Sequence, residues 1–334
     1  MKPLPFGYSR PVTVAEALAV LAAQGEEGKV LAGGQSLVPL LSMRLASPGH
    51  LVDINRLTDL AYVRVTGPAD PPEGGTFAGA RSEGRGTSEG ATREENVSQR
   101  PRAGLAERAS VTIGALARHA QVLADPAAAT AQPLLAQALR LVAHPAIRNR
   151  GTTVGSIVHA DPSGEMTAVL ALLGGTVRVA SQDGERVIGA GDFFLGPLES
   201  AVEPGELAVE ASFPVLPPRA GTAFAEVSRR HGDYAVCGVA ALVHLGEDGR
   251  LAQARAAYLS VGPCPVVVDL TEAVAGLPAG TTEFPAAGPL AQAQIRPGSD
   301  IHATAAYRRH LAGVLTQRAL REALGAARER GRDE

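Results

Sequence analysis

Two polar, glycine-containing runs hold the residues best suited to bind a ligand. The first is Ala32-Gly33-Gly34-Gln35-Ser36-Leu37, and the second extends from Arg148 to Pro162 around Gly151-Thr152-Thr153-Val154-Gly155-Ser156. Glycine lets the main chain approach a phosphate closely, while hydroxyl, amide and basic side chains add hydrogen-bond donors. We therefore expect the two runs to offer donors from opposite walls of a cleft to one extended anionic ligand.

The spacing of these glycines excludes two common nucleotide sites. Neither run has the spaced glycines of a dinucleotide-binding Rossmann loop, and no Gly-Lys-Ser or Gly-Lys-Thr sequence indicates a Walker loop. A Gly-Gly pair after a strand is by itself more often an ordinary turn. The argument for a site therefore depends on both runs together.

Short helices and strands must position the first run. Thr13-Val14-Ala15-Glu16 has the form of a capping box, with Glu16 reaching back to the cap, and predicts a helix that ends at Gln24 before Gly25. Val30-Leu31-Ala32 and the stretch from His50 to Ile54 are predicted strands, and Pro39 to Arg44 is a predicted short helix or turn. Residues 1–60 are thus expected to form a small α/β unit.

Residues 66–110 differ from the rest in composition. They are rich in Gly, Pro, Ser, Glu and Arg, with few large apolar residues. Such a segment buries too little apolar surface to offset the entropy lost on ordering. We predict a disordered insertion here.

Helices and strands are again predicted between residues 111 and 217. The second run lies between two predicted helices, Pro133 to Val142 and Met166 to Leu173. Further predicted elements are a helix from Ala115 to Leu123, a hairpin about Asp183-Gly184 that joins Thr176–Val179 to Arg186–Ile188, and a strand from Leu207 to Phe213.

A proline cluster at Pro214, Pro217 and Pro218 indicates a domain boundary. The region 219–328 beyond it is predicted to hold an antiparallel sheet of about three strands and helices at Leu270–Ala275 and from Thr304 to about Arg328. The three predicted strands are Ala223–Ser228, Val236–Leu245 and Leu251–Val261.

Composition narrows the class of protein. The net charge of -3 argues against nucleic-acid binding, and no apolar run is long enough for a transmembrane helix. The N-terminus, Met1 to Pro5, lacks the apolar core of a signal peptide, so we expect a cytoplasmic protein. The two cysteines, Cys237 and Cys264, have no spacing typical of a metal site or an iron–sulfur cluster, so any such cluster must belong to another chain.

The ordered set of runs resembles the FAD-binding medium subunits of molybdenum hydroxylases, including aerobic carbon monoxide dehydrogenase and xanthine dehydrogenase-like enzymes. The resemblance covers nearly the whole chain apart from the insertion. Besides the two glycine-containing runs, it includes Asp192-Phe193-Phe194-Leu195-Gly196-Pro197, Ser228-Arg229-Arg230-His231-Gly232-Asp233-Tyr234-Ala235, and the stretch from Asp300 to Leu311. Five runs in one order are a more specific signal than any single motif.

The resemblance implies an α+β fold with a two-lobed FAD-binding domain of the PCMH/VAO type, followed by a small α+β C-terminal domain. FAD would lie extended between lobes 1–60 and 111–217. By position, Val30 to Leu37 would hold the pyrophosphate and ribityl region through main-chain amides and Ser36, Thr152 to Ser156 would form the second wall, and Glu165 would be an acidic flavin contact. The residues implied to bind FAD are Val30, Leu31, Ala32, Gly33, Gly34, Gln35, Ser36, Leu37, Thr152, Thr153, Val154, Gly155, Ser156, His159, Asp161, Glu165, Ala208 and Tyr234.

One residue departs from the family pattern. Val154 stands where the family usually has the first of two adjacent glycines, and a β-branched residue tolerates a positive φ poorly. Either that position needs only an ordinary backbone conformation, which we favour, or FAD binding is weakened.

Several other side chains leave alternatives open. His159 and Asp161, two residues apart, would share one side of a strand, where they could be an acid/base pair or metal ligands. A hydrogen-bonded structural histidine that shapes the loop is the preferred interpretation. Tyr234 either covers the isoalloxazine ring or is a buried core residue. Arg148 and Arg150 either neutralise phosphates or form a solvated face.

The resemblance implies an electron-transfer subunit and no catalytic residue or metal on this chain. FAD would take electrons from a [2Fe–2S] cluster on a small partner subunit, which is reduced by a molybdopterin centre on a large partner subunit. It would pass them to an acceptor such as a quinone or NAD. The expected assembly is a dimerised heterotrimer. The alternatives are a flavin-free scaffold subunit of the same complex and a self-contained flavin oxidase or reductase.

Overall fold

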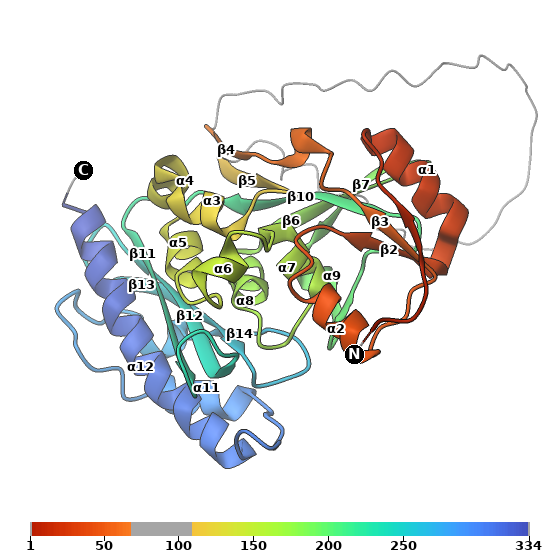
Figure 1. Ribbon diagram of the computed structural model, residues 1–334. Helices are drawn as coiled ribbons and strands as arrows, with labels where there is room; N and C mark the ends of the chain where they lie inside the picture. Colours follow the sequence, from red (N-terminus) through yellow and green to blue (C-terminus); the bar gives the residue numbers. More distant parts are fainter. Residues whose placement is uncertain (1, 68–108, 333–334) are drawn as a thin grey trace, which may run out of the picture.

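The computed structural model describes residues 2–67 and 109–332 of the chain (Figure 1). The predicted insertion at 66–110 lies outside the described residues except at its two ends. These ends belong to neighbouring antiparallel strands, in which Thr66 pairs with Ser110. The chain therefore leaves this sheet at Thr66 and returns to it at Ser110, the residue that pairs with Thr66.

The N-terminal part is a small parallel sheet with two helices. Its strands run in the order β1-β3-β2. The elements are β1 Gly7–Ser9, α1 Val14–Gln24, β2 Gly28–Leu31, α2 Leu37–Met43 and β3 His50–Asp53. The predicted helix α1 is confirmed, and Thr13 accepts a hydrogen bond from the backbone N–H of Glu16 at 3.2 Å. The Glu16 carboxylate accepts from Val12 N, not from the N–H of the cap residue.

The middle part contains a five-stranded antiparallel sheet with helices packed on it. The strand order is β4-β5-β10-β6-β7. The strands are β4 Val63–Thr66, β5 Ser110–Gly114, β6 Thr176–Ser181, β7 Gly184–Gly189 and β10 Leu207–Pro214. The helices are α3 His119–Ala124, α4 Pro126–Ala131, α5 Pro133–Leu139, α6 Pro145–Arg148, α7 Thr153–His159, α8 Glu165–Leu173 and α9 Ala190–Phe193, followed by the short hairpin β8 Phe194–Gly196 and β9 Glu199–Ser200. The predicted hairpin about Asp183-Gly184 is confirmed by the pairing of Ser181 with Gly184.

The C-terminal sheet has four strands, so the prediction of about three was wrong. The strands β11 Ala220–Ser228, β12 Ala235–Leu245 and β13 Leu251–Leu259 are joined by β14 Val266–Asp269, which pairs with β13. Three consecutive valines are too short a run to show alternation, and they follow Pro265, so local pattern did not reveal the fourth strand.

Both faces of this sheet are covered. Phe224, Ala240 and Leu259 belong to the core of the middle part, whereas Ala223, Ala241 and Tyr258 belong to the core beneath the C-terminal helices. Those helices are α10 Thr271–Val274, α11 Ala287–Gln294 and α12 Ala305–Arg330. Burial on two faces explains why β12 reads as an almost uninterrupted apolar run.

Helix α12 is the longest helix in the described residues and lies along β11 and β12 (Figure 1). Thr304 caps it by accepting a hydrogen bond from Tyr307 N at 3.2 Å. Gly221 of β11 faces the helix backbone, where a Cβ would overlap Ala323 O and Ala327 N. Neither α12 nor any other helix of the described residues is long and apolar enough to cross a membrane.

Candidate functional site

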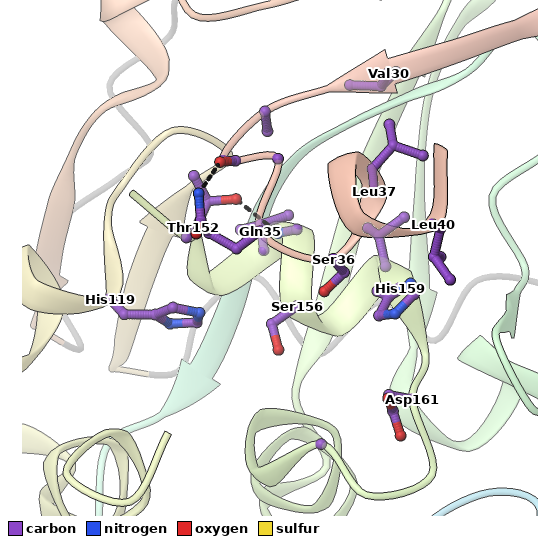
Figure 2. A pocket seen from close by; sticks show the side chains of 18 of the residues that line it. Val30, Gln35, Ser36, Leu37, Leu40, His119, Thr152, Ser156, His159 and Asp161 are labelled. Atoms are coloured by element: carbon purple, nitrogen blue, oxygen red, sulfur yellow. Dashed lines mark hydrogen bonds between the residues drawn. The ribbon is translucent and has the colours of Figure 1, made fainter. Parts of the chain in front are cut away.

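A cavity of about 540 Å³ opens where the three parts of the molecule meet. The loop between β2 and α2 forms one wall, helix α7 and the start of α8 form another, and Tyr234 extends into it from the loop between β11 and β12. Figure 2 shows Ser36 of the first run and Ser156 and His159 of the second run among the residues that line the cavity. The cavity therefore lies between segments that are far apart in the sequence.

Nearly all residues proposed from the sequence lie on this cavity. Those that line it are Val30, Ala32, Gly33, Gly34, Gln35, Ser36, Leu37, Thr152, Val154, Gly155, Ser156, His159, Asp161, Glu165, Ala208 and Tyr234. Leu31 and Thr153 do not line it. Leu31 belongs to the β2 ladder, and Thr153 is fully buried with its hydroxyl 3.2 Å from His119 Nδ1.

The first run presents unpaired backbone donors. Among the described residues, the N–H groups of Gly33, Gly34, Gln35 and Ser36 have no protein acceptor. Gly34 has a φ of +71°, which turns the chain sharply after β2. The side-chain amide of Gln35 donates to Gly33 O at 3.0 Å, so this side chain supports the loop. Consecutive free N–H groups beside a cavity are suited to an anionic ligand.

The second run is a helix, whereas the sequence analysis placed it in a loop or strand. Helix α7 spans Thr153–His159, and Thr152 caps it by accepting from Gly155 N at 3.2 Å. A Cβ at Gly155 would overlap the Thr152 hydroxyl, which explains the glycine. The threonines and glycines were interpreted as loop residues because they have low helix propensity, but Thr at a cap favours a helix.

Val154 has an ordinary backbone conformation. It lies in the first turn of α7, is absent from the described non-glycine residues with positive φ, and is 1% exposed. A β-branched side chain is therefore accommodated without the strain that the family pattern suggested.

Replacing Val154 by glycine should leave FAD affinity unchanged and lower stability. The variant loses a buried side chain and gains backbone entropy in the unfolded chain, at a combined cost of roughly 2–4 kcal/mol. Thermal unfolding of the flavin-free protein and titration with FAD would measure the two effects. Clearly tighter FAD binding by Val154→Gly would contradict this account.

Two carboxyl groups, the buried Glu165 and the half-buried Glu226, interact near the cavity. Glu165, at the start of α8, lines the cavity and is 9% exposed, and Glu226 lies on β11 with Oε2 buried and unpartnered among the described residues. Burial, and secondarily the charge of Asp161, raises the pKa of Glu165 to about 7. Burial, together with the charge of Glu165, raises the pKa of Glu226 to about 8. Glu226 therefore keeps most of its protonation at neutral pH, whereas Glu165 titrates close to neutral pH and, in its protonated form, can donate a hydrogen bond.

These pKa values predict a pH-dependent stability. Above the ordinary value of 4.5, the unfolded chain releases protons that the folded protein keeps up to about 7 and about 8. The folded state then binds more protons, so stability falls as the pH rises through this window and levels off above it. We expect Glu226→Gln to flatten the upper part of the fall, measured as Tm of the flavin-free protein across the window. The exposed Glu322→Gln is the control, and equal slopes in both variants would refute the assignment.

The two arginines and the histidine of the second run differ in whether they form side-chain hydrogen bonds and in whether they line the cavity. Arg148 donates to Val142 O at 2.7 Å and Ala143 O at 2.9 Å, and neither Arg148 nor Arg150 lines the cavity. His159 ends α7 and has no side-chain hydrogen bond to the described residues, contrary to the expected hydrogen-bonded histidine on a strand. No three His, Cys, Asp or Glu side chains of the described residues gather into a metal site.

Tyr234 is not a core residue. Its side chain is 68% exposed and lines the cavity, which excludes the buried alternative. Partial desolvation by the surrounding cavity lining, and then the charges of Asp161 and Glu165, raise the pKa of Tyr234, so the phenol stays protonated.

Sequence reasoning missed part of the lining. Lys29, His119, Leu198, Glu206 and Gly232 also border the cavity. Lys29 and Gly232 adjoin residues that were proposed and could have been found from the motifs. The other three come from separate elements that only the fold brings to the site.

Comparisons with known proteins agree with this architecture. Residues 4–69 and 104–216 match the model of the FAD binding domain in molybdopterin dehydrogenase, and residues 222–323 match the CO dehydrogenase flavoprotein C-terminal domain. The chain is 35% identical to the 6-hydroxypseudooxynicotine dehydrogenase complex subunit alpha of Paenarthrobacter nicotinovorans, covering 98% of this chain and 97% of that one. It is 30% identical to the carbon monoxide dehydrogenase medium chain of Afipia carboxidovorans, covering 98% of this chain and all of that one.

A solved structure gives the same result. Reconstituted CO dehydrogenase from Oligotropha carboxidovorans superposes with a TM-score of 0.80 at 29% identity, over 98% of this chain and 100% of that one. The chain therefore belongs to the FAD-binding medium subunits of the molybdenum hydroxylase family, which are oxidoreductase subunits.

Proposed function

We propose that this chain is the electron-transfer subunit of its complex, taking electrons from a [2Fe–2S] cluster on a small partner subunit and passing them to an acceptor such as a quinone or NAD. The observation that carries this proposal is the row of backbone N–H groups at Gly33 to Ser36, which have no acceptor in the described part of the chain and lie on the wall of a cavity between two glycine-containing runs. Such a wall suits the pyrophosphate of a dinucleotide.

The residues present fit FAD. The first run borders one side of the cavity, and Glu165 and Tyr234 border another. The lining combines backbone N–H groups that have no acceptor among the described residues with apolar side chains. Gly33 to Ser36 would hold the pyrophosphate, the start of α7 would form the facing wall, and Glu165, Ala208 and Tyr234 would contact the flavin. Bound FAD would supply the redox chemistry.

This chain's residues bind and orient the cofactor and set its polar surroundings. Glu165 offers a hydrogen bond from a buried carboxyl group, and Tyr234 partly shields the cavity from water. The substrate step needs no acid or base from this chain, because we assign it to the molybdopterin centre of a large partner subunit.

Several finer features belong to the same proposal. We infer a PCMH/VAO-type FAD-binding domain with lobes 1–60 and 111–217, a C-terminal domain at 219–328 and a dimerised heterotrimer. We place the complex in the cytoplasm, in keeping with the two unpaired cysteines, Cys237 and Cys264.

The flavin-free scaffold remains the alternative to test. It was motivated by Val154 and by the long insertion at 66–110. The helical conformation of Val154 removes the first of these reasons to expect weakened binding, and the insertion lies mostly outside the described residues.

The deciding experiment is the visible spectrum of the complex, co-expressed with its small and large subunits, followed by acid release and identification of the flavin. We expect FAD at one per chain, bleached when the complex receives its substrate. Carbon monoxide, caffeine and a hydroxylated pyridine are the first substrates to try, given the relatives' names. An assembled complex without flavin, even after FAD is added, would establish the scaffold alternative.

A further inference from the structure

A polar network outside the cavity joins the two glycine-containing runs. It begins at the first run, where the side-chain amide of Asn55 donates to Ala32 O at 2.8 Å. Asn55 is itself held by Asp53, whose Oδ1 accepts from the Asn55 backbone at 2.9 Å and from its side chain at 2.7 Å. Asp53 also accepts from Tyr8 Oη at 2.5 Å. The orientation of Asn55 is thereby determined by several partners.

Arg118 connects this network to the second run. One terminal nitrogen of its guanidinium donates to Asn55 Oδ1 at 2.6 Å, and the other donates to Arg150 O at 2.6 Å. The backbone around Arg118 is bound to the second run as well, since His119 N donates to Gly151 O at 2.9 Å and Thr153 N donates to Ala117 O at 3.2 Å. Arg118 is thus held to the second run by its side chain and by the backbone on either side of it. It reaches the first run through Asn55.

The two runs touch where this bridge spans them. A Cβ at Gly33 would lie 2.5 Å from Arg150 O and 2.7 Å from Gly151 Cα, so the main chains pass in direct contact. The separation of the two cavity walls is therefore defined at the level of the backbone. Arg118 and Asn55 themselves do not line the cavity, so they act on a ligand only through the runs.

The bridge also orients the donors of the first run. In a trans peptide the C=O and N–H groups point in opposite directions. Because Asn55 holds the carbonyl of Ala32, the N–H of Gly33 is directed away from Asn55, and this N–H has no acceptor among the described residues. If that peptide plane could rotate freely, the N–H of Gly33 would no longer be held in this direction.

We propose that Arg118 and Asn55 are positioning residues of the cofactor site, which hold the two runs at one separation and aim the backbone donors of the first run at the FAD pyrophosphate. This inference rests on the proposed binding of FAD. The guanidinium is suited to the task because its rigid fork presents two donors in fixed directions, which a lysine ammonium does not.

The test is FAD titration of the full-length, flavin-depleted chain by calorimetry, with Tm of the flavin-free protein measured in parallel. We expect Arg118→Lys and Asn55→Ala each to weaken FAD binding by about tenfold or more, since each breaks a hydrogen bond to a charged group or a loop carbonyl. The double variant should be little weaker than either single one, because both changes break one connection. Arg64→Lys, which changes an arginine stacked on Tyr62 outside the network, is the matched control.

The outcomes separate the possible explanations. If Arg118→Lys bound FAD with wild-type affinity, the proposal would be overturned, because a positive charge without the two fixed donors of the guanidinium would then be sufficient. Additive losses in the double variant would also overturn it. A fall in the Tm of flavin-free Arg118→Lys that accounts for the whole loss of affinity would reduce Arg118 to a general stabilising residue. A wild-type chain that binds no FAD would instead refute the proposed function.

Discussion

Replacing Gly33 by alanine should abolish FAD retention. The added Cβ would lie 2.5 Å from Arg150 O, 2.7 Å from Gly151 Cα and 3.0 Å from Thr152 N, all of them backbone atoms. No flexible side chain can move aside, so the two runs must separate. The hydrogen-bond donors on the two cavity walls would then no longer be placed to bind the same ligand. We expect FAD affinity to fall by about a hundredfold or more, equivalent to about 2.7 kcal/mol.

Flavin content per purified chain and FAD titration would measure this effect. Gly189→Ala is the matched control, because a Cβ there meets nothing within 4 Å and its φ of -72° suits alanine. Full flavin content in Gly33→Ala would show that the runs are not held in contact in solution.

Replacing Gly221 by alanine should destabilise the C-terminal domain strongly. Gly221 has no positive φ, so the effect is purely steric: a Cβ would overlap Ala323 O and Ala327 N and lie 2.9 Å from Ala327 Cα. Helix α12 must then move off β11, opening the core formed by Leu320, Ala323 and Leu324. We expect a loss of about 3 kcal/mol, at the upper end for overpacking.

Gly325→Ala, within α12, should raise stability instead of lowering it. A Cβ at Gly325 meets nothing within 4 Å, so alanine should raise stability by roughly 0.5–1 kcal/mol through its helix propensity. Chemical and thermal unfolding of both variants would test the pair. Equal Tm values for Gly221→Ala and wild type would mean that α12 does not pack on β11 as described.

Both predictions concern glycines at which main chain meets main chain. In a site built from backbone donors, the position of each loop matters more than the identity of most side chains. We therefore expect one methyl group at Gly33 to have a larger effect on FAD binding than most side-chain changes at the lining. The proposed role of Arg118, outside the cavity, rests on the same reasoning.

Local signals in the sequence determined much of the secondary structure and the position of the site. Thr13 and Thr304 mark the beginnings of α1 and α12 because a hydroxyl satisfies N–H groups within one turn. Asp183-Gly184 marks a hairpin for a similarly local reason. The two glycine-containing runs, in their order, were sufficient to predict an anionic ligand, and resemblance added FAD.

Tertiary structure decided what depends on contacts between distant residues. Val266–Asp269 is a strand because β13 offers it a partner, and the helix Thr153–His159, which Thr152 caps locally, is packed into the fold through the buried side chains of Val154 and Ile157. The exposure of Tyr234, the protonation of Glu226 beside Glu165 and the bridge from Arg118 to Asn55 have no local signature. Each depends on the degree of burial or on a neighbour from another part of the fold, and propensity within a short window contains no information about either.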